Sequence, residues 1–282
     1  MITRFAPAPT GLLHLGHVLN AVLVWEAARA RDGQVLFRIE DHDRERSRPE
    51  FESAILDDLD WLGFQPDIFP TDAFRAGRCE GRQSDRETVY LDAVGILERK
   101  GLIYGCDCTR KAIAAGNDAP ESAELRYNNR CRDRGLPLDE AIGWRVRMDD
   151  DDETFDDLRL GRQSQNPAAQ CGDLLIRDRI GNWTYQFAVT VDDWRQHIDL
   201  IVRGVDLLAS TGRQIRLARL LGRATPPAFL HHPLIMKSPT QKLSKSDGDT
   251  GVRDLRARGW TPARVIEAAL ALTGWQMVNG KW

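Results

Sequence analysis

Apolar and polar positions near the start of the chain predict a strand, a helix and a second strand. Residues 2–6 and 35–39 are short apolar runs of the kind that form buried strands. Between them, apolar positions recur at helical spacing over 17–32, and Gly33 follows as a predicted C-terminal cap. This order is typical of a parallel α/β sheet, in which ligands bind beyond the carboxyl ends of the strands. The loops after the two predicted strands are therefore the first places to look for chemistry.

The rest of the pattern predicts further helices, strands and a polar insertion. Ser47, Pro49 and Glu50 fit a capping box with an early proline, at the start of a helix that Gly63 ends. Residues 104–137 are polar and weakly periodic, and they predict an insertion. The remaining predicted elements are a helix over 82–100 before Gly101, an acidic loop over 149–153, two strands over 173–192 around a turn at 179–182, a strand within 226–239 and a helix over 261–272.

Composition narrows the class of protein without deciding its partners. Of 282 residues, 42% are apolar and 29% charged, as in a soluble globular enzyme of one large domain or two modest ones. No apolar stretch suits a membrane span or a signal peptide, so we expect no membrane partner and a cytoplasmic location. The net charge of −3 neither requires nor excludes a nucleic acid, and arginines concentrated in 126–134 and 203–223 leave room for a basic face.

The sequence HLGH at 14–17 is the first candidate binding segment. It follows a predicted strand and a loop of Pro, Thr and Gly, at the predicted start of a helix. The first turn of a helix offers unpaired N–H groups and attracts phosphate, and Gly16 removes side-chain bulk where a ligand approaches. Two imidazoles add hydrogen-bond donors without a permanent charge. The sequence therefore favours a nucleotide site over a turn with two incidental histidines.

The sequence KLSKS at 242–246 is the second candidate. Lys242 and Lys245 flank Leu-Ser, and small flexible residues follow. Such a loop closes on a polyphosphate and neutralises the charge that grows in a transition state. A bare K-x-S-K is more often a solvated turn, but here it pairs with an upstream histidine loop.

Together, HLGH and KLSKS resemble the two signature motifs of the class I aminoacyl-tRNA synthetases. RFAPAPTG, RIEDHDRERSRPEF, LLIRDRIGNWTYQFAVTVDD and LIVRGVDLL are similar to the glutamyl branch of that family, and the resemblance runs over about residues 2–258. It implies an α/β fold, namely a Rossmann-like parallel-sheet catalytic domain with a small inserted zinc-bearing subdomain. It also implies ATP-dependent activation of L-glutamate to glutamyl-adenylate by a ligase-type enzyme.

The resemblance assigns roles to residues of both motifs. His14, Gly16 and His17 would hold the ATP phosphates, and Lys245 would stabilise the departing pyrophosphate with help from Lys242. His14, His17, Lys242 and Lys245 are thus the implied catalytic set. Magnesium would arrive with ATP.

The resemblance also implies a pocket for glutamate. Arg4 and Arg203 match arginines that hold the substrate's carboxylate, Glu40 matches the acceptor for its α-ammonium group, and Tyr185 lines the pocket. Ala8 stands where the family usually has serine, so a hydroxyl contact to the amino acid is expected to be lost. For an isolated arginine a surface salt bridge is the simpler interpretation, and only the position within the motifs favours substrate binding.

Cysteines in the predicted insertion suggest a metal site. Cys106 and Cys108 form a C-x-C pair and Cys131 is a third sulfur, so one further ligand would complete a zinc tetrahedron. The alternative is three free thiols in a metal-free loop. The pattern C-x-C…Y-x-x-x-C resembles the structural zinc site of one small synthetase subgroup, which implies Tyr127 as the fourth ligand. Cys79 and Cys171 are predicted to be unrelated to it.

The chain ends at Trp282, soon after KLSKS, where glutamyl enzymes continue into an anticodon-binding region. With the cysteine–tyrosine pattern, this resembles the glutamyl-queuosine tRNA(Asp) synthetases, which implies tRNA(Asp) carrying queuosine as the acceptor and a monomeric protein. The implied division is a first half of the catalytic domain over 1–103, the cysteine-bearing insertion over 104–137, the remaining catalytic and acceptor-type region over 138–239, and the KLSKS loop with a short helical tail over 240–282, without an anticodon-binding domain.

Three other functions stay open at this point. The first is a truncated glutamyl-tRNA synthetase that charges a terminal adenosine. The second is a non-catalytic paralogue that senses glutamate or ATP, against which the intact HLGH and KLSKS motifs argue. The third is a small-molecule nucleotidyltransferase, which would not need the set of Arg4, Glu40, Tyr185 and Arg203.

Overall fold

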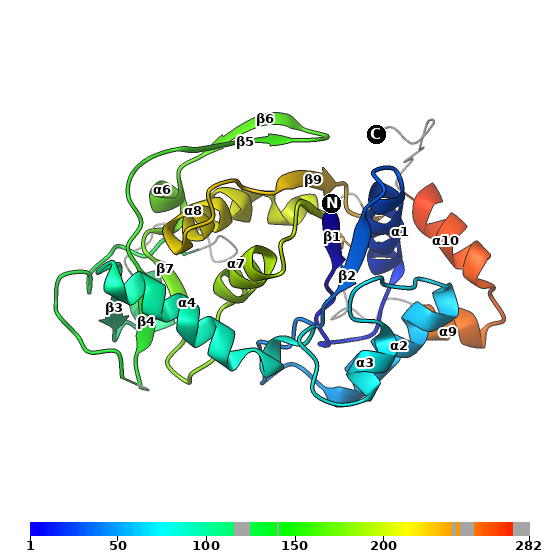
Figure 1. Ribbon diagram of the computed structural model, residues 1–282, viewed down its shortest axis with the longest axis horizontal. Coiled ribbons are helices and arrows are strands. Elements are labelled where there is room, and N and C mark those ends of the chain that lie inside the picture. The colour runs from blue at the N-terminus through cyan, green and yellow to red at the C-terminus, as the bar shows by residue number, and fades with distance from the viewer. Residues whose placement is uncertain (116–124, 140, 239–240, 243–250, 273–282) are drawn as a thin grey trace.

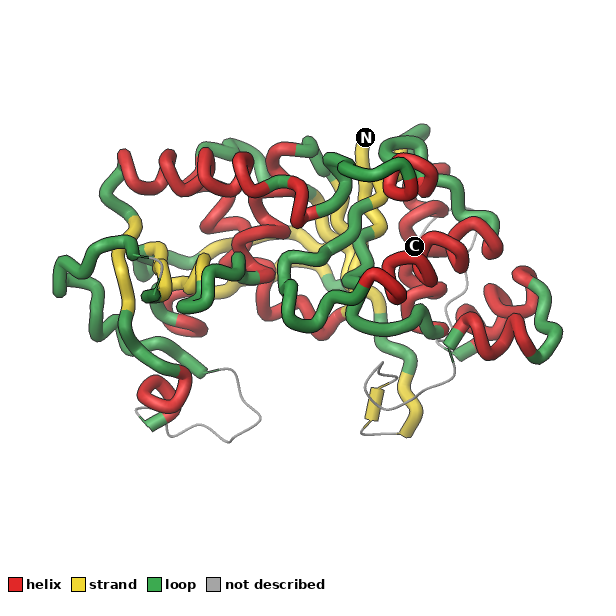
Figure 2. The backbone as a smooth tube through the Cα atoms, turned by 90° about the horizontal axis from the view of Figure 1, so that it is seen from below, coloured by secondary structure: helices red, strands yellow, loops and turns green. Residues whose placement is uncertain are grey.

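A computed structural model describes residues 1–115, 125–139, 141–238, 241–242 and 251–272 of the chain. Figure 1 shows an elongated molecule with a large sheet and its helices on one side and a small sheet on the other. In the view from below, the molecule is again elongated, and helices lie at the right-hand end of its long axis (Figure 2). Among the described helices, none combines the length and the apolar content that a membrane span requires.

The large sheet is mostly parallel, as the sequence predicts. Its strand order within the described residues is β2-β1-β8-β9-β5-β6, in which every pair is parallel except β5 with β6. The strands are β1 (Ile2–Phe5), β2 (Gln34–Phe37), β5 (Glu153–Asp157), β6 (Gly161–Gln165), β8 (Leu200–Gly204) and β9 (Ala228–His232). Because β1, β2, β8 and β9 run in one direction, their carboxyl ends share one edge of the sheet, where α/β proteins bind ligands.

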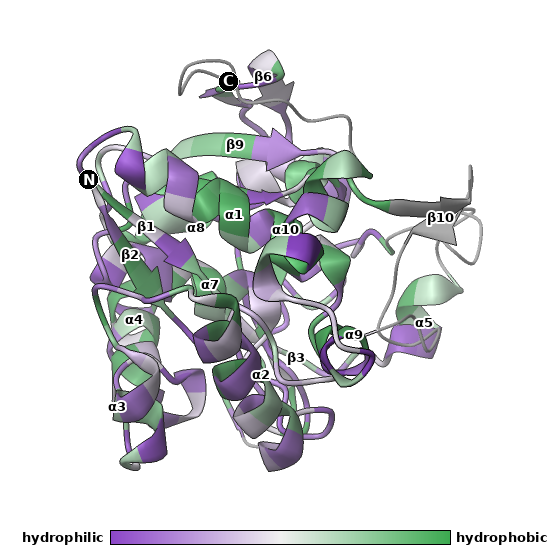
Figure 3. Ribbon diagram, turned by 90° about the vertical axis from the view of Figure 1, so that its right-hand side faces the viewer, coloured by the Kyte–Doolittle hydropathy of each residue, from purple (hydrophilic) through white to green (hydrophobic). Residues whose placement is uncertain are grey.

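Helices cover this sheet and form the larger core. The helix α1 (Leu15–Arg29) lies between the sheet and α10 (Pro262–Ala271), and it buries Val18, Leu19 and Leu23. In Figure 3, α1 shows much green, whereas α2 and α3 show much purple because their outer faces meet water. The other helices around this core are α2 (Pro49–Leu62), α3 (Thr71–Arg75) and α9 (Val252–Ala257).

A second core joins the small sheet to helices that include α4 (Glu87–Arg99), α6 (Pro167–Cys171), α7 (Tyr185–Arg195) and α8 (Thr211–Leu221). The small sheet is antiparallel with the order β3-β4-β7, from β3 (Ile103–Cys106), β4 (Gly143–Val146) and β7 (Leu174–Arg177). Trp144, Trp183 and Phe187 pack together here. The remaining elements are α5 (Arg110–Ala114), β10 (Met236–Ser238) and β11 (Gln241–Lys242), with short 3-10 helices at Gln83–Asp85 and Val205–Ser210.

Three local predictions are wrong. The segment 173–192 forms one strand, β7, and then α7 rather than two strands. The Ser47 capping box is absent, because Arg48 is the N-cap of α2 and makes no side-chain cap, while its N–H donates to the carbonyl of Pro9 at 3.0 Å. Gly33 does not cap α1, which ends at Arg29 with Ala30 as its C-cap, and a side chain at position 33 would collide with the backbone of Met1. Gly33 thus allows close packing at the start of β1.

Candidate active site

A first cavity, of about 430 Å³, opens at the carboxyl ends of β1 and β8. It brings together residues from five predicted segments, and its lining includes Arg4, His14, Gly16, His17, Glu40, Tyr185 and Arg203. Ala8 lies outside this lining. Lys242 belongs to β11, and Lys245 lies outside the described residues. The fold therefore collects the phosphate-type and the glutamate-type candidates at one edge of the sheet.

The two histidines of HLGH cap the first turn of α1. The Nδ1 atom of His14 accepts from the N–H of Gly16 at 3.0 Å, and Nδ1 of His17 accepts from the N–H of His14 at 3.1 Å. An imidazole nitrogen that accepts carries no proton, so Nε2 carries it in both neutral rings. With ring centroids 3.9 Å apart at the wall of the cavity, the pair presents N–H donors beside the start of α1, which is the chemistry that a phosphate needs.

Arg203 is buried and held entirely by neutral acceptors. Its Nε donates to Nε2 of His231 at 3.0 Å, Nη1 to Oε1 of Gln214 at 2.6 Å and Nη2 to the hydroxyl of Thr211 at 2.8 Å. Among the described residues, no carboxylate forms an ion pair with it at 4.0 Å or less. A guanidinium has five donors, so this arrangement fixes its plane and leaves its charge available to an anion in the cavity.

Arg4 lies in a different electrostatic environment. Its Nε pairs with Asp193 at 3.2 Å, and Arg38 pairs with the same carboxylate at 2.8 Å. Burial alone would raise the pKa of Asp193, but Arg4 and Arg38 hold that pKa below its ordinary value. Asp193 is therefore a buried anion that positions two cations below the cavity.

Glu40 provides the negative side of the cavity. Burial raises its pKa, although Arg38 at 3.5 Å and Arg4 oppose the shift. Burial and the nearby Glu40 raise the pKa of Tyr185 to about 12, so its phenol stays protonated and can donate. Cationic and anionic groups thus face one space, as a ligand with both charges requires.

Sequence reasoning missed several residues of this cavity, Asn20 and His232 among them. Asn20 of α1 donates to the carbonyl of Val202 at 3.1 Å and lies 3.2 Å from Nε2 of His232, and all three line the cavity with Asp206. Two adjacent histidines, His231 and His232, follow an apolar run in the sequence, and this signal could have predicted their place near the cavity. Asp193 could not be found, because its partners lie far away in the sequence.

His231 makes the folded state sensitive to acid. Its Nδ1 lies 2.7 Å from Asp157, and burial together with the charge of Arg203 lowers its pKa to about 4. In the unfolded chain His231 binds a proton below about pH 6.5, whereas the folded state resists until about pH 4, so this contribution to stability is lost as pH falls through that window. From about pH 7 to about pH 5 the wild type is expected to lose about 2 kcal/mol more stability than His231→Gln.

Urea unfolding at the two pH values measures this difference. The exposed His197 offers a matched control, and His197→Gln should follow the wild type. Equal acid sensitivity of His231→Gln and the wild type would contradict the prediction.

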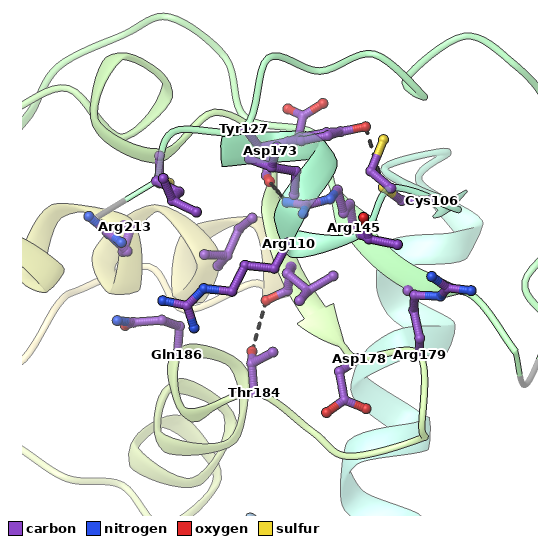
Figure 4. A pocket seen from close by; sticks show the side chains of 18 of the residues that line it. Cys106, Arg110, Tyr127, Arg145, Asp173, Asp178, Arg179, Thr184, Gln186 and Arg213 are labelled. Carbon is purple, nitrogen blue, oxygen red and sulfur yellow. Dashed lines mark hydrogen bonds between the residues drawn. The ribbon is translucent and has the colours of Figure 1, made fainter. Parts of the chain in front are cut away.

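A second cavity, of about 630 Å³, lies between the small sheet, α5 and the start of α7. Figure 4 shows Arg110 reaching from α5 toward Thr184 and Gln186, the two neighbours of Tyr185. Gln186 accepts from Gln214 at 2.8 Å, and Gln214 holds Arg203. The two cavities therefore lie on opposite sides of one hydrogen-bonded wall. The described charged residues of this lining are Arg110, Arg145, Asp173, Asp178, Arg179 and Arg213.

Both carboxylates of the second cavity are already engaged. Asp173 pairs with Arg132 and accepts the hydroxyl of Tyr104 at 2.6 Å. Asp178 accepts the N–H groups of Ile180 and Asn182 in the turn after β7. The side chains that line the cavity therefore carry a net positive charge, which suits a phosphate-bearing ligand.

The three cysteines of the insertion form a cluster beside this cavity. The sulfurs of Cys106, Cys108 and Cys131 lie within 4.8 Å of one another. Around a tetrahedral zinc ion, sulfurs are about 3.8 Å apart. The sulfurs of Cys108 and Cys131 are 3.5 Å apart, so the cluster fits a metal after small shifts. Tyr127 places its hydroxyl 3.4 Å from Cys106, as Figure 4 shows, and Asp107 lies 3.2 Å from Cys131. Asp107 contacts Cys131 alone among the three cysteines and also pairs with Arg134, whereas the hydroxyl of Tyr127 contacts Cys106 and the N–H of Cys131.

A comparison with protein families decides what kind of protein carries these cavities. The family described as tRNA synthetases class I (E and Q), catalytic domain, matches residues 1–281. The chain belongs to this synthetase family. It is therefore an enzyme of the ligase type, with the α/β catalytic fold of class I synthetases.

Individual relatives of this class I synthetase have two different names. It is 42% identical to a protein named glutamyl-Q tRNA(Asp) synthetase from Burkholderia cenocepacia, over 96% of this chain and 87% of that protein. It is 43% identical to one of the same name from Cupriavidus metallidurans, over 87% of this chain and 77% of that protein. It is 39% identical to a glutamate–tRNA ligase from Thermosynechococcus vestitus, over 98% of this chain but 58% of that protein.

Solved structures give the same fold. A glutamate–tRNA synthetase from Elizabethkingia anophelis has a TM-score of 0.80 and 27% identity, over 100% of this synthetase chain and 63% of its own. A glutamate tRNA ligase from Elizabethkingia meningosepticum, solved in complex with its amino acid, has a TM-score of 0.73 and 29% identity, over 88% of this chain and 52% of its own. The chain thus spans about half to two thirds of these two proteins.

Proposed function

We propose that this synthetase uses ATP to activate L-glutamate without tRNA and transfers the glutamate to queuosine in the anticodon loop of tRNA(Asp). The observation that carries the first part is the buried Arg203, whose neutral partners leave its charge available to an anion beside Glu40. The names of the relatives from Burkholderia and Cupriavidus support the second part.

Activation joins the α-carboxylate of glutamate to the α-phosphorus of ATP and releases pyrophosphate. Arg203, with Arg4 behind it, binds the side-chain carboxylate, and Glu40 accepts the α-ammonium group. The N–H donors of His14 and His17 hold phosphate oxygens at the start of α1. Lys245, assisted by Lys242, neutralises the leaving pyrophosphate, and magnesium bound to ATP supplies further positive charge. Positioning and electrostatic stabilisation carry this reaction.

The same geometry favours glutamate over glutamine. Arg203 already donates to the neutral oxygens of Gln214 and Thr211. Its positive charge is not yet paired there, so a carboxylate binds it more strongly than an amide does. Tyr185 stays protonated at neutral pH and adds a donor on the same side.

The second cavity supports an RNA acceptor. Its positive balance, its volume of about 630 Å³ and the shared wall at Gln186 suit a nucleotide whose hydroxyl must reach the first cavity. The modified base supplies its own hydroxyl, so the transfer requires no nucleophile from the protein.

Two reactions measured on the same preparation test this function. We expect glutamate, and not glutamine, to support pyrophosphate exchange into ATP without RNA. We also expect glutamate transfer to tRNA(Asp) that carries queuosine and not to the unmodified transcript. Absence of exchange would reject activation and indicate a glutamate or ATP sensor. Exchange without glutamate would indicate a small-molecule nucleotidyltransferase.

A glutamyl-tRNA synthetase core that charges a terminal adenosine is the second candidate. The observation in its favour is the match of 98% of this chain to a glutamate–tRNA ligase at 39% identity. Transfer to unmodified tRNA, or exchange that requires tRNA, would favour it over the queuosine acceptor.

Charge reversal in the second cavity tests the RNA site. Arg110→Glu is expected to weaken RNA binding and slow transfer by about tenfold or more, because a phosphate contact becomes a repulsion. Arg162→Glu, on the exposed strand β6, is the charge-matched control. Filter binding at two salt concentrations measures the loss. Equal effects of the two reversals would contradict a local RNA site.

We also propose that Cys106, Cys108 and Cys131 hold one structural zinc ion with Tyr127 as the fourth ligand. Purified protein is expected to contain about one equivalent of zinc, and Cys108→Ala to lose most of it and to melt at a lower temperature. Mass spectrometry measures the metal, with the distant Cys79→Ala as control. Zinc below about a tenth of an equivalent in wild-type protein prepared without chelator would contradict the proposal. Zinc loss in Asp107→Asn but not in Tyr127→Phe would reassign the fourth ligand.

A further inference from the structure

His42 lies next to Tyr185, which lines the first cavity, and it has no role in the activation described above. It follows Glu40 by two residues, beyond the carboxyl end of β2. Its ring faces the ring of Tyr185, with centroids 6.0 Å apart. Both neighbours line the first cavity, so His42 lies beside the space where the glutamyl group would be held.

A buried chain of hydrogen bonds supports the His42 ring from behind. Nδ1 of His42 lies 2.8 Å from Oε1 of Gln83, whose amide nitrogen donates to Asp192 at 2.8 Å. Gln83 is 1% exposed and Asp192 is fully buried. Asp192 also accepts from Nε of Arg86 at 2.7 Å and from the hydroxyl of Tyr90 at 3.0 Å. This series of hydrogen bonds therefore ends at the carboxylate of Asp192 on α7, whose negative charge Arg86 compensates.

The directions of the hydrogen bonds from His42 through Gln83 to Asp192 fix which ring nitrogen of His42 carries the proton. An ionised carboxylate only accepts, so the NH₂ group of Gln83 must face Asp192 and its oxygen must face His42. An amide oxygen also only accepts, so Nδ1 of His42 carries the proton in the neutral ring. Nε2 is then the nitrogen with the lone pair. Gln83 and Asp192 thus hold a proton acceptor in one orientation beside Tyr185, a residue of the cavity lining.

The transfer step is the reaction that needs such an acceptor, since a hydroxyl that forms an ester must lose its proton. Resting on the proposed function, we propose that His42 is the general base of the transfer and that Gln83 and Asp192 position it. The acceptor hydroxyl oxygen attacks the glutamyl carbonyl carbon, and the bond from that carbon to the phosphate oxygen breaks. AMP leaves with both electrons of that bond, and the hydroxyl proton passes to Nε2 of His42.

The charges around His42 suit this role. Glu40, two residues before it, interacts electrostatically with His42 and would stabilise the imidazolium that forms, and the ring of Tyr185 on α7 lies 6.0 Å away between centroids. Asp192, behind Gln83, adds a second negative charge at greater distance. These contacts resemble the arrangement of a histidine base oriented by a buried carboxylate, with an amide inserted between them.

Single-turnover transfer tests the proposal. Enzyme loaded with labelled glutamyl-adenylate is mixed with tRNA(Asp) that carries queuosine. His42→Ala is expected to slow transfer by about 100-fold or more, and added imidazole to restore the rate in proportion to its concentration. Gln83→Met is expected to cause a smaller loss, because methionine no longer holds Nδ1–H. His197→Asn, which removes an exposed imidazole elsewhere, should match the wild type with and without imidazole.

The outcomes separate this inference from the function on which it rests. His42→Ala as fast as the wild type would overturn the inference alone, as would a loss that imidazole does not restore, because that loss would be structural. Wild-type enzyme that forms the adenylate but transfers glutamate to no RNA would overturn the proposed transfer, and the inference with it. Melting curves and pyrophosphate exchange on each variant confirm that the proteins compared are folded.

Discussion

Arg203→Gln is expected to abolish most glutamate-dependent pyrophosphate exchange. Arg203 is buried, and its described partners His231, Gln214 and Thr211 are all neutral, so a bound carboxylate would complete its ion pairing. Removing one member of a buried ion pair costs about 3–5 kcal/mol, which corresponds to a fall in kcat/KM for glutamate on the order of a thousandfold. Exchange measured over a range of glutamate concentrations separates this loss from an effect on ATP.

The exposed Arg162 provides the control for this substitution. Arg162 lies on β6 and pairs with Asp156 at the surface, so Arg162→Gln should retain the kinetics of the wild type. Arg203→Lys keeps the charge but not the planar fork of donors, and an intermediate loss is expected. If Arg203→Gln used glutamate as well as the wild type does, Arg203 would not bind the substrate's carboxylate.

Asp193→Asn is expected to produce the largest loss of stability. Asp193 lies 3.2 Å from Arg4 and 2.8 Å from Arg38, which is fully buried, and its removal leaves both guanidinium groups with less compensating charge. The expected loss in the free energy of unfolding is about 3–5 kcal/mol, the cost of breaking a buried ion pair from one side. Urea unfolding at neutral pH measures it.

The acid dependence of stability provides a second measurement of the ion pairs of Asp193. The pKa of Asp193 is held below its ordinary value in the folded state, so its contribution to stability is present above the ordinary carboxyl pKa and is lost as pH falls through the folded value. Asp156→Asn, at an exposed ion pair, should cost less than about 1 kcal/mol. Equal losses in the two variants would contradict the central role of Asp193.

Local sequence signals predicted the elements whose determinants are themselves local. Thr261 caps α10 and Pro262 begins it, while Gly63 ends α2 in the left-handed conformation, because these effects act within one helical turn. The HLGH segment lies at the start of α1 as predicted, although His14 is already the cap and the helix begins two residues earlier than expected.

Other elements depend on contacts that the local pattern does not show. The segment after β7 is rich in residues that favour strands, yet α7 forms because a helix directs Asp192 toward Arg86 and Asp193 toward Arg4. In a strand these neighbouring carboxylates would point to opposite faces of a sheet. Tertiary ion pairs thus override the strand propensity of this segment.

Motif spacing and the order of elements along the chain were sufficient to predict the family of this synthetase, the parallel α/β class and most of the candidate residues that line the first cavity, because both can be seen without knowledge of long-range contacts. The contacts around those residues became visible only in the folded protein. It showed that Arg203 lacks a described carboxylate partner whereas Arg4 shares Asp193, and that Gln83 orients His42. Charge compensation depends on distances of a few ångströms between residues far apart in the chain, and folding alone brings such residues together.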